Sequence, residues 1–289
     1  MKHPPKPSER SRALVSGRKI LFVSLLLTSI SAFGFEFDQA TRDAYFQRGG
    51  NEKALKHLEC IMKMTKHQTF EIKKSRILPG RCGKVEAGRR QISVNNTDWA
   101  VLIDYTKHSS KRRMFLFNLD GSRPSRVVSF YVSHGRYGRT NRGNRSSAGG
   151  KNTIGRLIKT SNRPGSNATS TGLYITGHTY VGKWKGPSGR ERSLVVHGIE
   201  KGINDNACDR AVVMHGNGFV NERGSGVGVN RMSSGCFMTD YKWVTKIANR
   251  IKGSTRKGGA PFFVYGKREA GLDADYYCGD KAKKTVRFD

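Results

Sequence analysis

The sequence predicts a mostly β (α+β) domain that follows a small helical region. Glycine is frequent and proline is not, with 34 residues against 8, which indicates many tight turns and argues against an all-helical bundle. Short β-type runs begin at Trp99 and recur along the rest of the chain. A length of 289 residues with 36% apolar content is sufficient for a hydrophobic core.

Residues 1–34 have the pattern of a secretory signal peptide. Six lysines and arginines precede an uncharged apolar run at 20–33, which is shorter than the roughly 20 residues that a membrane-spanning helix needs. Ala32 and Gly34 supply small residues before a cleavage point at Phe35. We therefore expect an exported protein, periplasmic or associated with the cell envelope; an uncleaved membrane anchor is the alternative.

Residues 35–90 are expected to form the helical region. After a break at Gly49 and Gly50, apolar residues recur at spacings of three and four, which is the period of a helix packed on a core. The members of this stripe are Ala54, Leu55, Leu58, Ile61, Met62 and Thr65.

From Trp99 the apolar period changes to that of strands. The dipeptide Asp120-Gly121 predicts a hairpin between two of them. One helix follows, capped by Thr239 and Asp240 and stopped by Gly253. We expect strands at 99–105, 113–119, 126–133, 173–176, 194–198, 211–215 and 261–266.

The charge of the chain implies an anionic partner. Lysine and arginine number 53 against 22 aspartates and glutamates, a formal net charge of +31, which suits nucleic acid, an anionic lipid surface or an acidic envelope polymer. The loop at 135–145 carries arginine at every third position among glycines, either as a solvated loop or as a docking surface. Because zinc-finger spacing, an RNP-like strand and a helix-turn-helix are all missing from the sequence, we expect no specific nucleic-acid partner.

Five cysteines in an exported chain predict disulfides and one unpaired thiol. Pairing Cys60 with Cys82 would close a short loop, and pairing Cys208 with Cys278 would tie the C-terminal tail to the domain. This arrangement leaves Cys236 free.

The free thiol lies in the region where chemistry is concentrated. A cysteine nucleophile needs a base, because a thiol with a pKa near ~8.5 is mostly protonated at neutral pH. His215, at the end of an apolar strand-like run, is the nearest candidate, and Gly235 beside Cys236 allows backbone amides to approach a substrate oxyanion. An inert buried cysteine and a core histidine are the structural alternative.

These residues resemble the L,D-transpeptidases with a YkuD-type catalytic domain. The family motif is a histidine, 14 to 17 residues, then Ser/Thr-His-Gly-Cys; here His215 is followed by 17 residues and then Ser233-Ser234-Gly235-Cys236. Ser234 replaces the second histidine and Met238 replaces a polar residue, so the resemblance is to a divergent branch. Over about 95–268 it also includes Asp104-Tyr105 with Ser109, Ser110 and Arg113, as well as Ser133-His134-Gly135, 171–177 and 198–207.

The resemblance implies a curved sheet or β-sandwich, with the catalytic domain at 91–268. Residues 269–289, outside the matched part, are expected to form a basic C-terminal tail. Cys236 would be the nucleophile, His215 its general base, and the amides of Gly235 and Cys236 the oxyanion hole, supported by Ser233, Ser234 and Gly216. The substrates would be peptidoglycan stem peptides, with no cofactor and no metal. Arg231, His134, His197 and Tyr174 are the candidates for substrate binding.

Two rivals are a sortase-like thiol transpeptidase and a non-catalytic cationic module that binds the cell wall. A sortase would place its histidine farther from the cysteine and an arginine after it, which the spacing from His215 to Cys236 disfavours. Whether an amine or water resolves the acyl-enzyme, giving a transpeptidase or an L,D-carboxypeptidase, stays open.

Overall fold

The protein consists of two mainly antiparallel β-sheets and a few short helices. The computed structural model describes residues 35–73, 82, 84–86, 89–121, 126–137, 155–182, 186–220, 233–254 and 257–288. Together these residues belong to one compact unit, Phe35–Asp289. The predicted signal peptide at 1–34, Arg231 and the part of the arginine-rich loop after Tyr137 lie outside the described residues.

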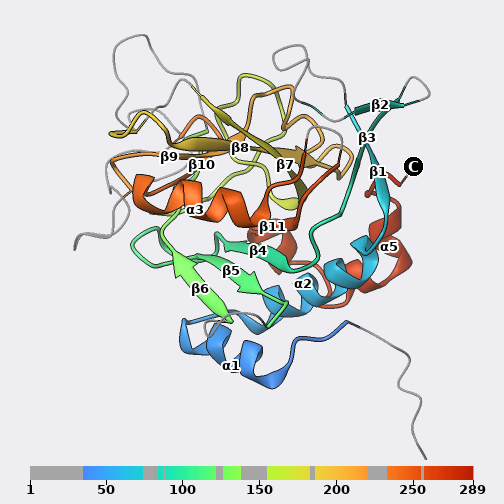
Figure 1. Ribbon diagram of the computed structural model, residues 1–289. Coiled ribbons are helices and arrows are strands. Elements are labelled where there is room, and N and C mark those ends of the chain that lie inside the picture. The colour runs from blue at the N-terminus through green and yellow to red at the C-terminus, as the bar shows by residue number, and fades with distance from the viewer. Residues whose placement is uncertain are drawn as a thin grey trace, which may run out of the picture. The chain divides into compact units, whose positions relative to one another are not determined.

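The larger sheet has eight strands in the order β10-β9-β8-β7-β11-β4-β5-β6 (Figure 1). The β10–β9 and β11–β4 pairs are parallel and the others are antiparallel. The strands are β4 (Trp99–Asp104), β5 (Met114–Asn118), β6 (Val127–Phe130), β7 (Gly172–Val181), β8 (Arg192–Gly198), β9 (Val213–Gly216), β10 (Phe237–Thr239) and β11 (Pro261–Tyr265).

The sheet is curved and nearly closed on itself, because the segment after β6 runs beside β10. The Ser133 amide donates to the Met238 carbonyl at 2.9 Å, and the Thr239 hydroxyl donates to the Tyr131 carbonyl at 2.9 Å. The expected mostly β fold with a curved sheet is confirmed, and all seven expected strands are present within a few residues of their expected bounds.

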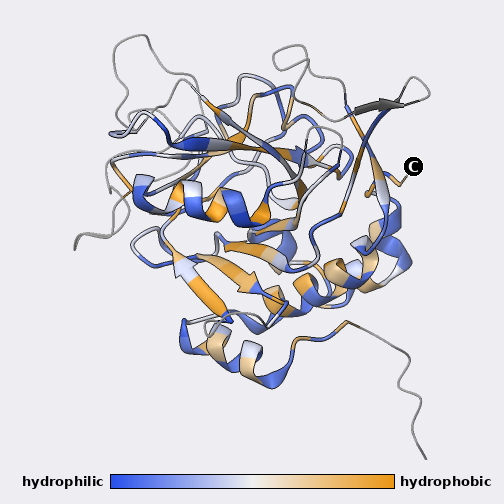
Figure 2. Ribbon diagram, in the orientation of Figure 1, coloured by the Kyte–Doolittle hydropathy of each residue, from blue (hydrophilic) through white to orange (hydrophobic). Residues whose placement is uncertain are grey.

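Helices cover the two faces of the central strands. In β4, Val101 and Ile103 belong to the core inside the curved sheet, which α3 (Tyr241–Ile251) closes, whereas Ala100 and Leu102 belong to the core under α2 (Glu52–Thr65). Figure 2 shows the resulting pattern, with α3 alternating between hydrophobic and hydrophilic residues while β5 is mostly hydrophobic. The Asp240 side chain caps α3 by accepting from the Lys242 amide at 2.9 Å.

The region expected to be helical is helical only in its first half. α1 (Gln39–Gln47) and α2 are followed by a three-stranded sheet of β1 (Thr69–Ile72), β2 (Lys84–Glu86) and β3 (Arg89–Ser93) in the order β1-β3-β2. In β1 the burial alternates, with Phe70 and Ile72 inward. A four-residue strand is too short to show its period against the longer helical stripe before it.

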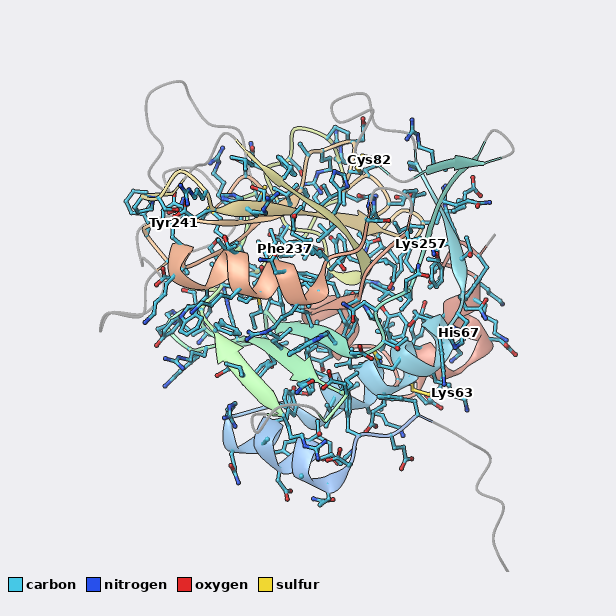
Figure 3. The ribbon with its side chains drawn as sticks, in the orientation of Figure 1. Lys63, His67, Cys82, Phe237, Tyr241 and Lys257 are labelled. Carbon is cyan, nitrogen blue, oxygen red and sulfur yellow. A yellow bond between two sulfur atoms is a disulfide. The ribbon has the colours of Figure 1, made fainter. Side chains whose placement is uncertain are left out.

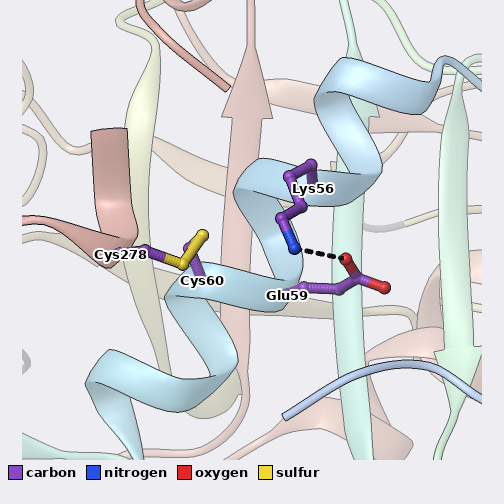
Figure 4. Close-up of a disulfide and its surroundings, with 4 residues drawn as sticks. All are labelled: Lys56, Glu59, Cys60 and Cys278. Carbon is purple, nitrogen blue, oxygen red and sulfur yellow. Dashed lines mark ion pairs between the residues drawn. A yellow bond between two sulfur atoms is a disulfide. The ribbon is translucent and has the colours of Figure 1, made fainter. Parts of the chain in front are cut away.

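The expected disulfide pairings are wrong. Cys60 is joined to Cys278 and Cys82 to Cys208, and Cys236 is the free cysteine. The physical reason is the packing of α2 against the 3-10 helix η1 (Tyr276–Cys278), which brings the Cα atoms of Cys60 and Cys278 to 4.6 Å (Figure 4). Proximity in sequence did not indicate this contact.

The C-terminal residues, expected to be a tail outside the catalytic domain, are packed on it. They include α4 (Lys267–Ala270), η1 and α5 (Asp280–Lys283). Tyr277 is 1% exposed, and residues 286 and 288 form isolated bridges with Glu200 and Phe70. Within the described residues, none of the helices combines the length and the apolar character needed to cross a membrane.

Candidate functional site

The candidate site lies along the seam where the curved sheet closes. Ser233, three residues before Cys236, donates its amide to the His134 carbonyl at 2.9 Å, and its own carbonyl accepts from the Arg136 amide at 3.1 Å. The seam therefore brings together two segments, 133–136 and 233–239, that are about a hundred residues apart in the sequence.

Cys236 is half-buried at the start of β10. Its Sγ donates to the Ala211 carbonyl oxygen at a sulfur–oxygen distance of 3.7 Å. Burial raises the pKa of the Cys236 thiol, while a hydrogen bond from the Val213 backbone and the positive charge of Arg210 lower that pKa in part. The thiol is thus the resting form, in a place that already contains groups favouring the thiolate.

His215 is 4% exposed on β9, and one of its ring nitrogens has a fixed role. Its Nδ1 is 2.9 Å from the Gly216 carbonyl oxygen. Because a carbonyl only accepts, Nδ1 carries the proton and Nε2 is the basic nitrogen. Burial lowers the pKa of His215 below its usual range, so the imidazole is neutral at neutral pH. A Cβ on Gly216 would lie 2.4 Å from the Tyr241 ring at the start of α3 (Figure 3).

Strand register places Cys236 and His215 on one face. His215 is paired with Met238 in the parallel β9–β10 register. Since alternate residues of a strand share a face, continuing that alternation back from Met238 puts Cys236 on the face of His215, opposite Val213 and two residues along the strand from the pair of His215 with Met238. Phe237, between Cys236 and Met238, points to the opposite side and packs in the core with Met214 (Figure 3).

Ser233 holds the loop before Cys236 by hydrogen bonds. The Ser233 hydroxyl donates to the Cys236 carbonyl at 2.6 Å and accepts from the Gly235 amide at 3.1 Å. Gly235 has φ +116°, and its carbonyl accepts from the Thr169 hydroxyl at 3.3 Å. The Gly235 amide, expected in an oxyanion hole together with the Cys236 amide, is thus bonded to the Ser233 hydroxyl in this structure. Ser234 is exposed.

His134 stands beside this loop with a fixed tautomer. Arg113, fully buried, donates from Nη2 to His134 Nδ1 at 2.8 Å. A guanidinium only donates, so His134 accepts at Nδ1 and carries its proton on Nε2. The Arg113 guanidinium also lies over the Tyr105 ring, 4.7 Å from its centroid, and the Tyr105 hydroxyl donates to the Ser133 carbonyl at 2.7 Å. This cluster fixes the 133–135 side of the seam.

The other candidate residues differ in their surroundings. Tyr174 is a core residue: it is fully buried, its hydroxyl donates to the Ser170 carbonyl at 3.0 Å, and its ring meets the edge of Phe237. His197 packs over Gly177 of β7, where a Cβ would lie 2.6 Å from its Nε2, and burial lowers its pKa to about 3. Its contacts are with β7 rather than with the 233–236 loop.

Arg210 was not among the sequence candidates, although its charge acts on Cys236. It lies in the turn before β9 and donates to the Ser161 carbonyl at 2.8 Å, the Ser170 hydroxyl at 2.8 Å and the Ala168 carbonyl. Its position five residues before His215, at the start of the apolar run, was the available signal. In a chain with 53 basic residues that signal does not stand out.

No group of three or more histidine, cysteine, aspartate or glutamate side chains capable of holding a metal ion is found in the described part of the chain.

Among the solved structures that match the chain, three examples all have low sequence identity. An L,D-transpeptidase from Xylanimonas cellulosilytica is 17% identical over 62% of this chain and 66% of that one, with a TM-score of 0.28. Bd1075 of Bdellovibrio bacteriovorus is 12% identical over 75% and 59%, and the helical cell shape determining protein Pgp2 of Campylobacter jejuni is 11% identical over 75% and 56%, each with a TM-score of 0.31. The chain spans less than two thirds of the length of each of them.

No curated protein sequence matches the chain. A family profile described as the L,D-transpeptidase catalytic domain does match, over residues 83–257. This range is more than half of the 289 residues and includes His215, Arg210 and the loop that ends at Cys236. The chain therefore belongs to the family of L,D-transpeptidase catalytic domains.

Proposed function

We propose that this protein is an exported L,D-transpeptidase that acts on peptidoglycan stem tetrapeptides through a thioester at Cys236. The observation that carries the proposal is that the single free cysteine, in a chain whose other four cysteines are paired, lies on the face of β9–β10 that also carries His215. Both are inside the range that matches the family.

The proposed reaction has two steps. His215 Nε2 removes the thiol proton, and Sγ attacks the carbonyl of the L-centre that precedes the terminal D-residue. The carbon–nitrogen bond breaks, the proton held by His215 goes to the leaving amine, and a free D-amino acid departs while the acyl group stays on Cys236 as a thioester. An amine of a second stem peptide then attacks the thioester, which gives a 3→3 crosslink and regenerates the thiol.

The protonation states support this order of events. The neutral His215 imidazole can accept a proton, and the protonated Cys236 thiol can give one. The oxyanion would be met by the Cys236 amide, since the Gly235 amide is bound to Ser233. His134 and Arg231 are proposed to contact the substrate: His134 as an Nε2–H donor, and Arg231 as a cation for a carboxylate.

Product analysis tests the proposal. Protein comprising residues 35–289 is incubated with disaccharide tetrapeptide, and the products are separated and weighed by mass spectrometry, with Cys236→Ala as the inactive control. We expect crosslinked dimers with loss of one D-amino acid, none in Cys236→Ala, and a drop of about 100-fold or more in His215→Gln.

Other outcomes identify the alternatives. Tripeptide without dimer would indicate the L,D-carboxypeptidase, in which water resolves the thioester. No product from the intact protein and its Cys236→Ala variant alike would defeat the enzyme proposal and favour a non-catalytic cationic wall-binding protein.

We also propose that an anionic polymer of the cell envelope binds the outer face of α3. Lys242 and Lys246, both exposed, lie one turn apart with Trp243 between them, and the ring of Trp243 is 5.1 Å and 5.3 Å from their ammonium groups. Arg250 continues the row beside Trp99. Within the described residues, neither Lys242 nor Lys246 forms an ion pair with a carboxylate, so their charges remain available to a polyanion.

A further inference from the structure

Arg210 is held rigidly by groups that carry no charge. Its Nη1 donates to the Ser161 carbonyl and the Ser170 hydroxyl, both at 2.8 Å, and its Nη2 donates to the Ala168 carbonyl and, at 3.4 Å, to the Ser166 hydroxyl. Among the described residues no carboxylate forms an ion pair with it. A half-buried guanidinium whose partners are all neutral keeps its full positive field for whatever lies next to it.

The neighbour of this guanidinium is the nucleophile loop. A Cβ placed on Gly235 would lie 3.2 Å from Arg210 Nη2 and 2.7 Å from the Ala168 carbonyl oxygen that Arg210 holds. The Cys236 sulfur contacts the carbonyl of Ala211, the residue that follows Arg210. The guanidinium therefore packs against Gly235, and its charge acts on Cys236, the next residue of the motif.

We infer that Arg210 is a positioning residue for the nucleophile: it holds the 161–170 segment against Gly235 and supplies the positive charge that stabilises the Cys236 thiolate. The inference rests on the proposed function of Cys236 as nucleophile, but it concerns a property of the thiol that is measured without any substrate.

Two opposing effects act on that thiol. Burial raises the pKa of Cys236, and the charge of Arg210 lowers it. Burial also lowers the pKa of Arg210, and negative charge at Tyr174 and at Cys236 raises that pKa in part. Removing the charge while keeping the burial should leave the thiol with less thiolate at every pH below its pKa, and the thiolate is the reactive form.

If Arg210 had a purely structural role, its replacement would shift the pKa of Cys236 in the opposite direction. If Arg210 only fixed the 161–170 segment, its loss would loosen the packing over Gly235 and admit water to Cys236. Relief of burial would then lower the pKa of the thiol and raise its reactivity. The direction of the shift separates the two roles.

The test is the pH profile of Cys236 alkylation by iodoacetamide in the unreduced chain, followed by intact mass. Only one of the five cysteines is unpaired, so each added carbamidomethyl group reports Cys236. The variants are Arg210→Gln, which removes the charge, and Arg210→Lys, which keeps the charge but loses part of the hydrogen bonding. Arg163→Gln, an exposed arginine in the same 161–170 segment, is the matched control.

We expect the midpoint of the profile to move up by about one pH unit in Arg210→Gln, which is about tenfold less thiolate below the midpoint. Arg210→Lys and Arg163→Gln should stay within a few tenths of a unit of the parent. An unchanged or lowered midpoint in Arg210→Gln overturns the inference.

If Arg210→Gln does not fold, Arg210→Met, which retains an apolar side chain of similar length, gives the same comparison. If neither neutral variant folds, Arg210→Lys decides, because a midpoint that moves by a full unit although the charge is kept overturns the inference. The alkylation profile is independent of peptidoglycan turnover. Loss of the Arg210 effect and loss of the proposed transpeptidation are therefore distinguished.

Discussion

At the scale of single residues, Cys236 is surrounded by the Ala211 carbonyl, the Val213 backbone and the charge of Arg210. The sequence pointed to Cys236 and His215, but not to these groups. Cys236 was singled out because a free thiol after Ser-x-Gly resembles a family motif, and His215 because it ends an apolar run. Arg210 was missed because its role depends on a fold that brings the turn before β9 under Gly235, which no local pattern shows. The disulfide pairings were wrong for the same reason: the contact of α2 with η1 is tertiary.

Gly235 supports a prediction at this scale. Its φ of +116° disfavours any side chain, and a Cβ there would also be 2.7 Å from the Ala168 carbonyl oxygen. Gly202 has φ +75° with nothing within 4 Å of its Cβ position, so Gly202→Ala isolates the backbone cost of about 1 kcal/mol. We expect Gly235→Ala to lower the free energy of unfolding by about 2 to 4 kcal/mol, because overpacking adds to that cost.

Urea unfolding of both glycine variants measures the difference, and alkylation of Cys236 reports whether the loop has moved. Equal losses in Gly235→Ala and Gly202→Ala would show that the backbone of Ala168 yields easily, and would contradict the tight packing described here.

At the scale of elements, the seven expected strands and the helix at 241–251 formed because each carries its own period and its own stop signals. Val244, Ile247, Ala248 and Ile251 are the buried face of α3, and the Asp240 cap is readable in the sequence. β10 was not expected as a strand, because three residues are too few to show a strand period. Its pairing with β9 is a tertiary contact that no local pattern in the sequence indicates.

The outer face of α3 gives the prediction for this scale. The double variant Lys242→Glu/Lys246→Glu reverses two charges and should weaken binding of the chain to polyphosphate by about tenfold or more at low salt. The affinity should also depend less on salt concentration, because the lost lysine–phosphate contacts are ones that salt screens. Lys66→Glu/Lys267→Glu, two exposed lysines on other elements, makes the same change in net charge. Fluorescence titration at several salt concentrations measures both variants.

If the two double variants lose affinity equally, the outer face of α3 is not the binding site, and only the net charge of the chain attracts the polymer. Binding of the parent chain to phosphatidylglycerol vesicles but not to polyphosphate would point to a lipid surface instead of a polymer.

At the scale of the whole molecule, closure of the sheet creates the site and the C-terminal residues stabilise the layer behind it. A separate tail is expected because 269–289 lies beyond the family motifs. Its description as basic is wrong, since the segment holds four lysines and arginines against five aspartates and glutamates. Its buried contacts depend on Glu200, which is fully buried and sits in the turn between β8 and β9 that also contains Arg210. Glu200 accepts from the Leu173 amide at 2.9 Å and pairs with Arg268 at 3.2 Å.

Replacing Tyr277 tests how much the contact between the C-terminal segment and Glu200 stabilises the fold. Its hydroxyl donates to Glu200 Oε1 at 2.7 Å in a buried setting, whereas the hydroxyl of the adjacent Tyr276 meets Thr285 Oγ1 at 3.3 Å in a partly exposed one. Tyr277→Phe leaves a buried carboxylate oxygen without that donor and should cost about 1 to 3 kcal/mol of unfolding free energy. Tyr276→Phe should cost less than about 1 kcal/mol of unfolding free energy.

Removing the Cys60–Cys278 bridge with Cys60→Ser/Cys278→Ser should cost about 2 to 5 kcal/mol of unfolding free energy, because the denatured chain then gains conformational entropy.

Deleting 269–289 in the Cys60→Ser background removes all of these contacts together, along with the Arg287 and Phe288 contacts to Asp205 and Phe70. We expect this chain to lose cooperative unfolding in urea and to lose protection of Cys236 from alkylation, because the turn that carries Arg210 then loses Tyr277 and Val286 at Glu200 and Arg287 at Asp205. A truncated chain that unfolds cooperatively, with the Cys236 alkylation profile of the parent, would show that the catalytic domain ends at 268 as its sequence suggested.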